Sequence, residues 1–207
     1  MKLSALPSGW KLFGLLAVLT LAMTALILAA QPLGSDGLRS AIRATARSSF
    51  ALFLLTFLAS SLAILVPGDM TRRLVRERRY LGLAFAISHT VHGVLIYQYA
   101  QQFPALFWAG RTVTSSLPGT FGYVFILLLT LTSFKAPMRL LGSQAWKRLH
   151  STGTWVIALV FCLSFYKRIP MGSWYVLAFS TMFAAIALKL TAKLAVRRRR
   201  ATAAISS

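Results

Sequence analysis

Three histidines are the residues in this sequence whose types and spacing could carry chemistry. His89 and His92 stand three positions apart in a long apolar run, so they would share one face of a helix. His150 stands near the start of a later apolar run. An ionisable side chain inside a membrane span is costly and indicates function by default. Neutral imidazole binds iron well, so the histidines could ligate haem; alternatively, each could hydrogen-bond a hydroxyl or carbonyl group of a neighbouring helix.

No other catalytic or metal-binding pattern is visible. The single cysteine, Cys162, lies in an apolar run, and the sequence has neither a CxxC pair nor a CxxCH motif. The three carboxylates, Asp36, Asp69 and Glu77, fall outside the apolar runs, which argues against proton-coupled transport and against carboxylate catalysis. The absence of a P-loop and of GxGxxG leaves no nucleotide site indicated.

The composition places the histidines in a membrane protein. Of the 207 residues, 57% are hydrophobic and 13% are charged, whereas an ordinary soluble domain has about 25% charged residues. Six uncharged runs reach the length of about 20 residues that a helix needs to cross a bilayer. We therefore expect an all-α fold, a polytopic bundle of six transmembrane helices. The runs are residues 12–30, 49–66, 80–100, 117–134, 149–166 and 171–188.

Lysine and arginine are unevenly distributed around these runs. Of the 23, 17 lie at the N-terminus, in the second and fourth connections and in the C-terminal tail, and six lie in the other connections. The positive-inside rule then places both termini in the cytoplasm. The net charge of +20 indicates contact with anionic lipid head groups, and no motif supports nucleic-acid binding. The first run could instead be a cleaved signal peptide, although it exceeds the usual apolar length of about 7–15 residues.

The chain shows no sign of a separate soluble domain. We expect one transmembrane domain over residues 1–200 and a disordered tail over residues 201–207. The connection over residues 101–116 is rich in aromatic residues, and we expect it to lie along the membrane surface.

Two segments together resemble the MsrQ/YedZ branch of the ferric reductase-like transmembrane family. The first is Arg-Arg-Tyr-Leu-Gly-Leu at residues 78–83, followed by His92 in the same run. The second is Thr-Ser at 132–133, Leu-Gly at 141–142, Trp146 and Leu-His at 149–150. The order and spacing of these segments are similar to that family over about residues 45–170, and six helices of this total length also fit it.

The resemblance implies a b-type haem protein that moves electrons across the bacterial inner membrane. His92 matches the third-helix haem ligand and His150 matches the histidine that begins the fifth helix, so both would ligate the haem iron. Arg78 and Arg79 would meet the haem propionates, or they are topogenic charges. MsrQ-like proteins pass electrons to a periplasmic enzyme that repairs oxidised methionine. Because no flavin domain is visible, we expect a separate cytoplasmic donor, a flavoprotein (which could bring FMN) or a quinol.

One position departs from the family pattern. The family has another histidine 13 residues beyond the first of the fifth helix, and here that position is Leu163. By helix rise, His92 lies about 18 Å past Tyr80 and His150 only about 6 Å past Trp146, a mismatch in depth of roughly 12 Å. His89, an addition to the pattern, lies about 4–5 Å closer to the cytoplasmic side than His92.

Three arrangements follow from this mismatch. Either His92 or His89 holds a five-coordinate haem, or His150 pairs with His89 because the fifth helix starts deeper. The third is a relative that has lost haem and acts as a membrane scaffold or assembly partner. A small-molecule transporter is the weakest alternative, because the spans have no paired charges and no inverted repeat. As a redox protein, the chain would be the membrane subunit of a two-component oxidoreductase.

Overall fold

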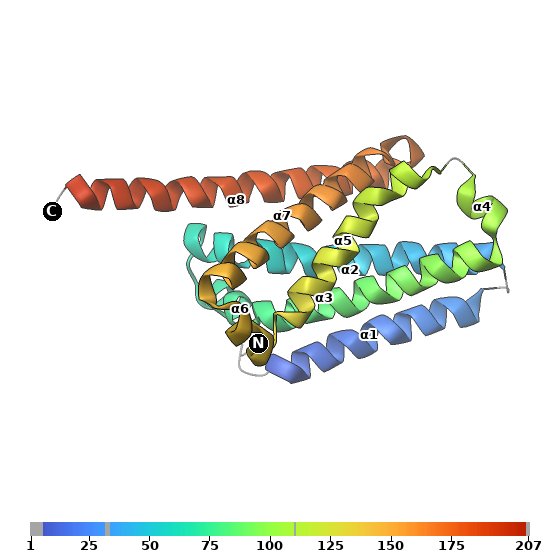
Figure 1. The fold of residues 1–207 in the computed structure, drawn as a ribbon, viewed down its shortest axis with the longest axis horizontal. Coiled ribbons are helices and arrows are strands. Elements are labelled where there is room, and N and C mark those ends of the chain that lie inside the picture. The colour runs from blue at the N-terminus through green and yellow to red at the C-terminus, as the bar shows by residue number, and fades with distance from the viewer. Residues whose placement is uncertain (1–5, 32–33, 110, 206–207) are drawn as a thin grey trace.

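The computed structural model describes residues 6–31, 34–109 and 111–205, and every regular element within that part of the chain is a helix (Figure 1). The helices are α1 (Gly9–Ala30), α2 (Ser35–Leu65), α3 (Asp69–Gln102), α4 (Pro104–Trp108), α5 (Val113–Leu131), α6 (Lys135–Leu141), α7 (Ser143–Tyr166), the 3-10 helix η2 (Ile169–Met171) and α8 (Ser173–Ile205).

Five of the described helices, α1, α2, α3, α7 and α8, are each long and apolar enough to cross a membrane. A sixth span results if α5 and α6 count as one, although α6 is bent by 102° from α5. The carbonyl of Thr132, at this break, accepts a 2.8 Å hydrogen bond from the Trp146 indole N–H of α7. Because a backbone group freed by a helix break needs a partner inside a bilayer, this bond stabilises the bend. The chain is thus a multi-pass membrane protein with five or six candidate spans.

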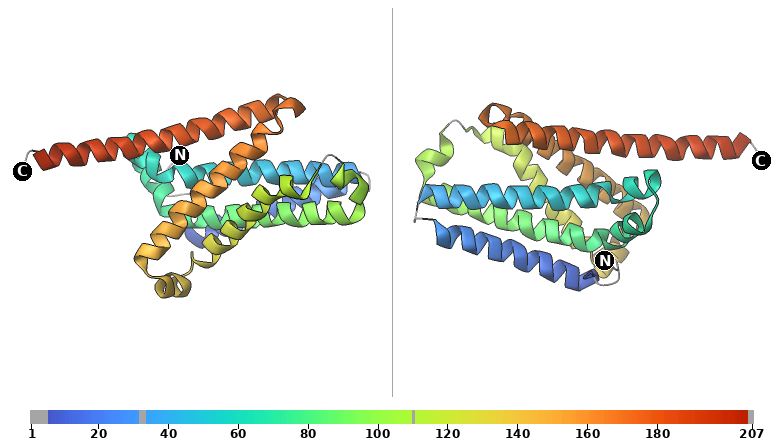
Figure 2. Two further views of the ribbon diagram at one scale, coloured as in Figure 1. Left: turned by 45° about the horizontal axis from the view of Figure 1, so that its top comes forward. Right: turned by 180° about the vertical axis from the view of Figure 1, so that it is seen from behind.

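The helices pack in an order that differs from their order along the chain. α3 packs against both α1 and α2, α8 packs against α2 and α7, and α5 packs against α7 (Figure 2). The start of α1 and the end of α8 lie at the same end of the bundle, and the last part of α8 projects beyond the other helices (Figure 1). An even number of spans is consistent with this placement of the termini.

Three helices extend more than ten residues beyond the uncharged runs from which they were predicted. α2 begins at Ser35 and α3 at Asp69, because a helix satisfies its own backbone groups and can continue through the head-group region with arginines on its surface. α8 continues over residues 201–205, which were expected to be disordered; alanine, a strong helix former, occupies three of these positions. Residues 206–207 of that tail lie outside the described residues.

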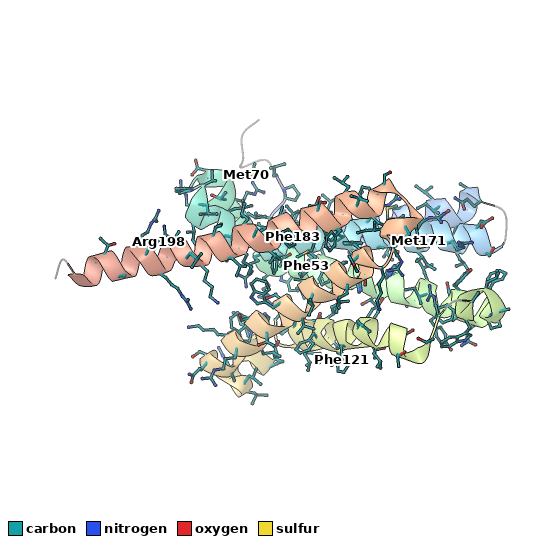
Figure 3. The ribbon with its side chains drawn as sticks, turned by 90° about the horizontal axis from the view of Figure 1, so that it is seen from above. Phe53, Met70, Phe121, Met171, Phe183 and Arg198 are labelled. Atoms are coloured by element: carbon teal, nitrogen blue, oxygen red, sulfur yellow. The ribbon has the colours of Figure 1, made fainter. Side chains whose placement is uncertain are left out.

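The core is a cluster of phenylalanines between α2, α3 and α7. Phe53 and Phe57 of α2 are almost fully buried, and Phe161 of α7 packs on Phe53 with ring centroids 5.2 Å apart. Phe85 of α3 also packs on Phe53, with ring centroids 5.4 Å apart. Figure 3 shows Phe53 inside the bundle, and Arg198 in the projecting part of α8. These rings fix α7 against α2 and α3, and the histidines of α3 lie next to them.

Glu77 attaches the beginning of α1 to α3. Its side chain is buried and accepts a 2.7 Å hydrogen bond from the backbone N–H of Gly9, the first residue of α1. The first N–H groups of a helix have no partner within the helix, and a carboxylate is favourable at this end of the helix dipole. Glu77 therefore acts as a cap supplied by another helix.

Replacing Glu77 by alanine is expected to lower the free energy of unfolding by about 1–3 kcal/mol, because the part-buried Gly9 N–H loses its acceptor. Glu77→Gln keeps an acceptor oxygen at the same place and is the matched control, with a smaller loss. Thermal unfolding of the purified protein in detergent measures both. Equal stability of the two variants would contradict a capping role.

Candidate functional site

A row of polar contacts joins α2 to α3 inside the bundle. Ser48 and Ser88 are hydrogen-bonded through their hydroxyl oxygens at 2.9 Å. His89, the next residue on α3, and His92, about one turn further along, continue the row toward α2. In an apolar bundle, such side-chain hydrogen bonds fix how two helices are rotated and shifted against each other. The row therefore determines which way the imidazoles face.

His92 is held in one tautomer by a backbone carbonyl. Its Nδ1 lies 3.0 Å from the carbonyl oxygen of Ile42 and 3.3 Å from the hydroxyl oxygen of Thr45. A carbonyl oxygen can only accept, so Nδ1 carries the proton and donates. In the neutral ring the lone pair is then on Nε2, which makes no hydrogen bond to any described residue. Metal-ligating histidines commonly have this second-shell bond on the other nitrogen.

His89 has the same orientation one turn earlier on α3. Its Nδ1 lies 3.2 Å from the hydroxyl oxygen of Ser49. The Ser49 hydroxyl donates its own hydrogen to the carbonyl of Ala46 at 3.0 Å, so we assign the proton of this second bond to His89 Nδ1. The two imidazole rings are 5.2 Å apart between centroids, and neither Nε2 makes a hydrogen bond to any residue that the structure describes. Both histidines therefore offer a nitrogen lone pair from the same helix.

Both histidines line a cavity of about 470 Å³, here called the outer cavity, within the range of about 300–1,000 Å³ found for ligand sites. α2, α3, α5 and α7 form its walls, and aromatic side chains make up much of them, including Phe50, Tyr123 and Phe161. Its lining also contains five exposed arginines, Arg39, Arg43, Arg47, Arg111 and Arg168.

The five arginines make the outer cavity a site for anions. The lining contains no carboxylate, and none of the five is ion-paired with a described aspartate or glutamate. Arg47 lies over the Trp174 ring at 4.8 Å, and Arg111 lies over the Phe107 ring at 4.4 Å. A concave site lined by charge of one sign concentrates its potential and attracts the opposite charge. A ligand with anionic groups and a flat apolar ring system would match this lining.

Tyr123 of α5 holds the third wall of the outer cavity against α3. Its hydroxyl donates a 3.2 Å hydrogen bond to the carbonyl of His89, and its ring lies 4.9 Å from the His89 ring. Gly93 leaves room for the Tyr123 ring, because a Cβ at this position would lie only 2.8 Å from the Tyr123 hydroxyl oxygen. The position of Tyr123 therefore depends on a residue next to His92.

His150 lies in a second cavity of about 560 Å³, the inner cavity. Its Nε2 is 3.0 Å from the hydroxyl oxygen of Thr132, whose own hydrogen is donated to the Leu128 carbonyl at 2.6 Å. His150 therefore donates from Nε2, the opposite tautomer to that of the α3 histidines. Its ring packs on Trp146 with centroids 4.2 Å apart. Thr132, its hydrogen-bonding partner, lies at the break between α5 and α6, and Trp146, its packing partner, supports that break.

Arg78 and Arg79 also line the inner cavity. Arg78 donates a 2.9 Å hydrogen bond to the Ser60 hydroxyl. The Arg79 guanidinium lies 5.7–5.8 Å from three aromatic rings, those of Trp10, Tyr80 and Phe134. Its Nε is buried and has no hydrogen-bond partner among the described residues. Both arginines are thus next to His150 and away from His89 and His92.

The structure therefore separates the predicted site residues into two groups. His89 and His92 share the outer cavity, while His150, Arg78 and Arg79 share the inner one. Ile126 and Ile157 line both cavities and so lie between them. Along α3, His92 is 13 residues beyond Arg79, roughly 20 Å at the rise of an α-helix. In this arrangement neither His92 nor His89 forms a ligand pair with His150.

The sequence interpretation missed the partners of the histidines and the arginine cluster. Thr45 and Ser49 are ordinary small polar residues, and nothing local marks them as contacts of α3. A signal for the arginines was present, since Arg39, Arg43 and Arg47 recur every four residues and so occupy one face of α2. They also lie in a connection to which the positive-inside rule assigns few cations. Their placement there is explained by the cavity that they line.

The outer cavity fits haem on the chemistry of its donors. It offers the His92 imidazole, whose Nδ1 is hydrogen-bonded to a backbone carbonyl and whose Nε2 is available as a ligand. Its walls are aromatic, and its arginines supply guanidinium groups for two propionates. The inner cavity fits it less well, because His150 Nε2 is engaged with Thr132 and no second histidine faces it. Among the described residues no group of three or more His, Cys, Asp or Glu side chains could hold a bare metal ion.

A protein-family model described as ferric reductase like transmembrane component matches residues 45–162. The match spans more than half of the 207 residues and includes all three histidines. The comparisons with curated proteins and with solved structures each found no match. The candidate membrane spans agree with the family match. The chain therefore belongs to the ferric reductase-like transmembrane family.

Proposed function

We propose that this protein is a transmembrane electron carrier that binds b-type haem in the outer cavity, with His92 as the axial ligand. The observation that carries the proposal is the His92 imidazole, which lines this cavity with its Nδ1 tied to the Ile42 carbonyl and its Nε2 without a hydrogen bond to any described residue. A bound haem would supply a reversible one-electron couple at this position. Membership of the family supports the same reading.

The residues around His92 would each have a defined task. Ile42 and Thr45 fix the ring orientation, which keeps Nε2 available and raises its basicity as a ligand. Arg43 and Arg47 would bind propionate groups by charge-assisted hydrogen bonds. Phe50 and Phe161 exclude water from the inner end of the cavity, and such exclusion influences the redox potential.

The direction of electron flow follows from the orientation of the chain. With both termini in the cytoplasm, as the distribution of lysine and arginine predicts, the inner cavity faces the cytoplasmic side and the outer cavity the periplasmic side. The donor, a flavoprotein or a quinol, would then act at the inner cavity, where the polar side chains of His150 and Arg79 could contact it. The acceptor would be a periplasmic protein, as in the MsrQ/YedZ branch, and the setting would be a bacterial inner membrane.

A dithionite-reduced minus oxidised visible spectrum of the detergent-purified protein tests the proposal. We expect a b-type spectrum, and a pyridine haemochrome assay is expected to give one haem per chain. A colourless protein from cells supplied with excess haem would overturn the proposal. That result would favour a haem-less membrane scaffold or assembly partner, for which the absence of a second fifth-helix histidine is the supporting observation.

A further inference from the structure

The wall of the outer cavity opposite α3 contains no histidine. The α7 residues that line it recur on one helical face and include Phe161, whose ring lies 5.9 Å from the His89 ring. Ser164 is one turn further along this face. Leu163, which stands where the family has its second fifth-helix histidine, is 39% exposed and is not part of the lining. The full set from α7 is Ile157, Val160, Phe161, Ser164 and Phe165.

His89 cannot complete the coordination of a haem bound to His92. Two axial ligands approach the iron from opposite faces of the porphyrin, whereas residues three apart on a helix project from the same side of it. The two imidazoles are tilted by only 39° with centroids 5.2 Å apart, so both come from the α3 wall. One of them can ligate, and the other lies beside it.

The other lining side chains that ligate haem iron in proteins are tyrosine and methionine. Tyr123 has its hydroxyl hydrogen donated to the His89 carbonyl. Tyr99 is buried against Phe103, in a separate cluster near the outer end of α3. Tyr175 packs against the main core cluster. Met171 is 69% exposed, in the turn before α8.

We infer that haem bound to His92 has an open axial position facing α7, and that this position takes a small diatomic gas such as carbon monoxide or nitric oxide. The inference rests on the proposed function, because it concerns the same cavity. The apolar Val160 and Phe161 and the hydroxyl of Ser164 line that side, a setting suited to a small neutral ligand with one hydrogen-bond donor nearby. The family pattern, with a second histidine on the fifth helix where this chain has Leu163, would leave no such position.

A carbon monoxide difference spectrum of the dithionite-reduced, haem-loaded protein tests the inference. We expect the reduced spectrum to shift on addition of the gas and resonance Raman spectra of the reduced protein to show five-coordinate, high-spin haem. Haem that is six-coordinate, low-spin and unresponsive to the gas would overturn the inference and leave the proposed function standing. A protein without haem would overturn both.

Two histidine substitutions on neighbouring positions of α7 sharpen the test. Ser164→His puts an imidazole on the cavity face and is expected to give low-spin haem with loss of carbon monoxide binding. Leu163→His puts the same group one residue away on an exposed face and is expected to keep the gas response of the parent protein. A gas response that is lost in the Leu163→His variant and kept in Ser164→His would contradict the geometry. If either variant fails to fold, the carbon monoxide difference spectrum of the unmodified protein still shows whether the axial position is open.

Discussion

Substitution of His92 by alanine is expected to remove essentially all haem from the purified protein. The outer cavity offers no replacement ligand on the α5 and α7 walls, and the His89 imidazole lies about 4–5 Å along α3 from the position of His92. Haem content per chain by the pyridine haemochrome assay, with the reduced spectrum, measures the effect. We expect His89→Ala to retain haem, since its imidazole lies beside the ligand.

A graded variant separates ligation from a general disturbance of the bundle. Thr45→Val removes the hydroxyl near His92 Nδ1 but leaves the Ile42 carbonyl in place. Loss of such a second-shell partner typically lowers metal affinity about 10–100-fold. Because the carbonyl bond is retained, we expect haem affinity to fall by about 10-fold. Haem titration of the apoprotein measures this smaller change.

The variant His150→Ala is the control in the other cavity. Since Ile126 and Ile157 lie between the two cavities, we expect this substitution to leave haem content unchanged. It removes the hydrogen bond to Thr132 and the packing on Trp146, so it should affect electron entry from the cytoplasmic donor instead. Loss of haem in His150→Ala together with its retention in His92→Ala would place the haem in the inner cavity and contradict the assignment.

Hydrophobicity and family resemblance were sufficient for the coarse architecture. Uncharged runs near 20 residues predicted membrane helices, and the all-helical fold with five or six candidate spans agrees with that prediction. The resemblance carried by residues 78–83, His92 and His150 predicted the family, which the family match confirms. Helix rise alone predicted that His92 and His150 differ in depth, and the structure places them in separate cavities.

The details of the site required contacts between distant segments. Arg78 and Arg79 were interpreted as propionate contacts or as topogenic charges, and the structure places them in the inner cavity with His150, roughly 20 Å along α3 from His92. The arginines in the outer cavity come from α2, from the segment before α5 and from the turn after α7. No local pattern brings these three segments together, because their meeting depends on how the helices pack. The break between α5 and α6 likewise depends on Trp146, which is 14 residues from the Thr132 carbonyl.

Among the glycines whose surroundings the structure describes, an added methyl group would make its closest contact at Gly93. In Gly93→Ala the new Cβ would lie 2.8 Å from the Tyr123 hydroxyl oxygen and 3.0 Å from two ring carbons. The Tyr123 ring is held by its bond to the His89 carbonyl and by the His89 ring, so it cannot move away without losing both contacts. Overpacking of this kind costs about 1–3 kcal/mol.

Gly82→Ala is the matched control, because it is the same substitution in the same helix. There the new Cβ would meet only a Thr56 methyl carbon at 3.6 Å, an ordinary contact. Alanine is favoured over glycine inside a helix by about 1 kcal/mol, so Gly82→Ala should be neutral or stabilising. Thermal unfolding in detergent compares the two, and we expect Gly93→Ala to be clearly the less stable.

A second substitution identifies the cause of that loss. Tyr123→Ala alone removes a packed ring and should destabilise, but in the Gly93→Ala background it also removes the clash. The two effects should therefore be less than additive, with a coupling free energy within the range of about 0.5–3 kcal/mol seen for residues in contact. Additive losses, or a Gly93→Ala variant as stable as Gly82→Ala, would show that α5 can shift without cost. Tyr123 would then not be what fixes the wall of the outer cavity against His89.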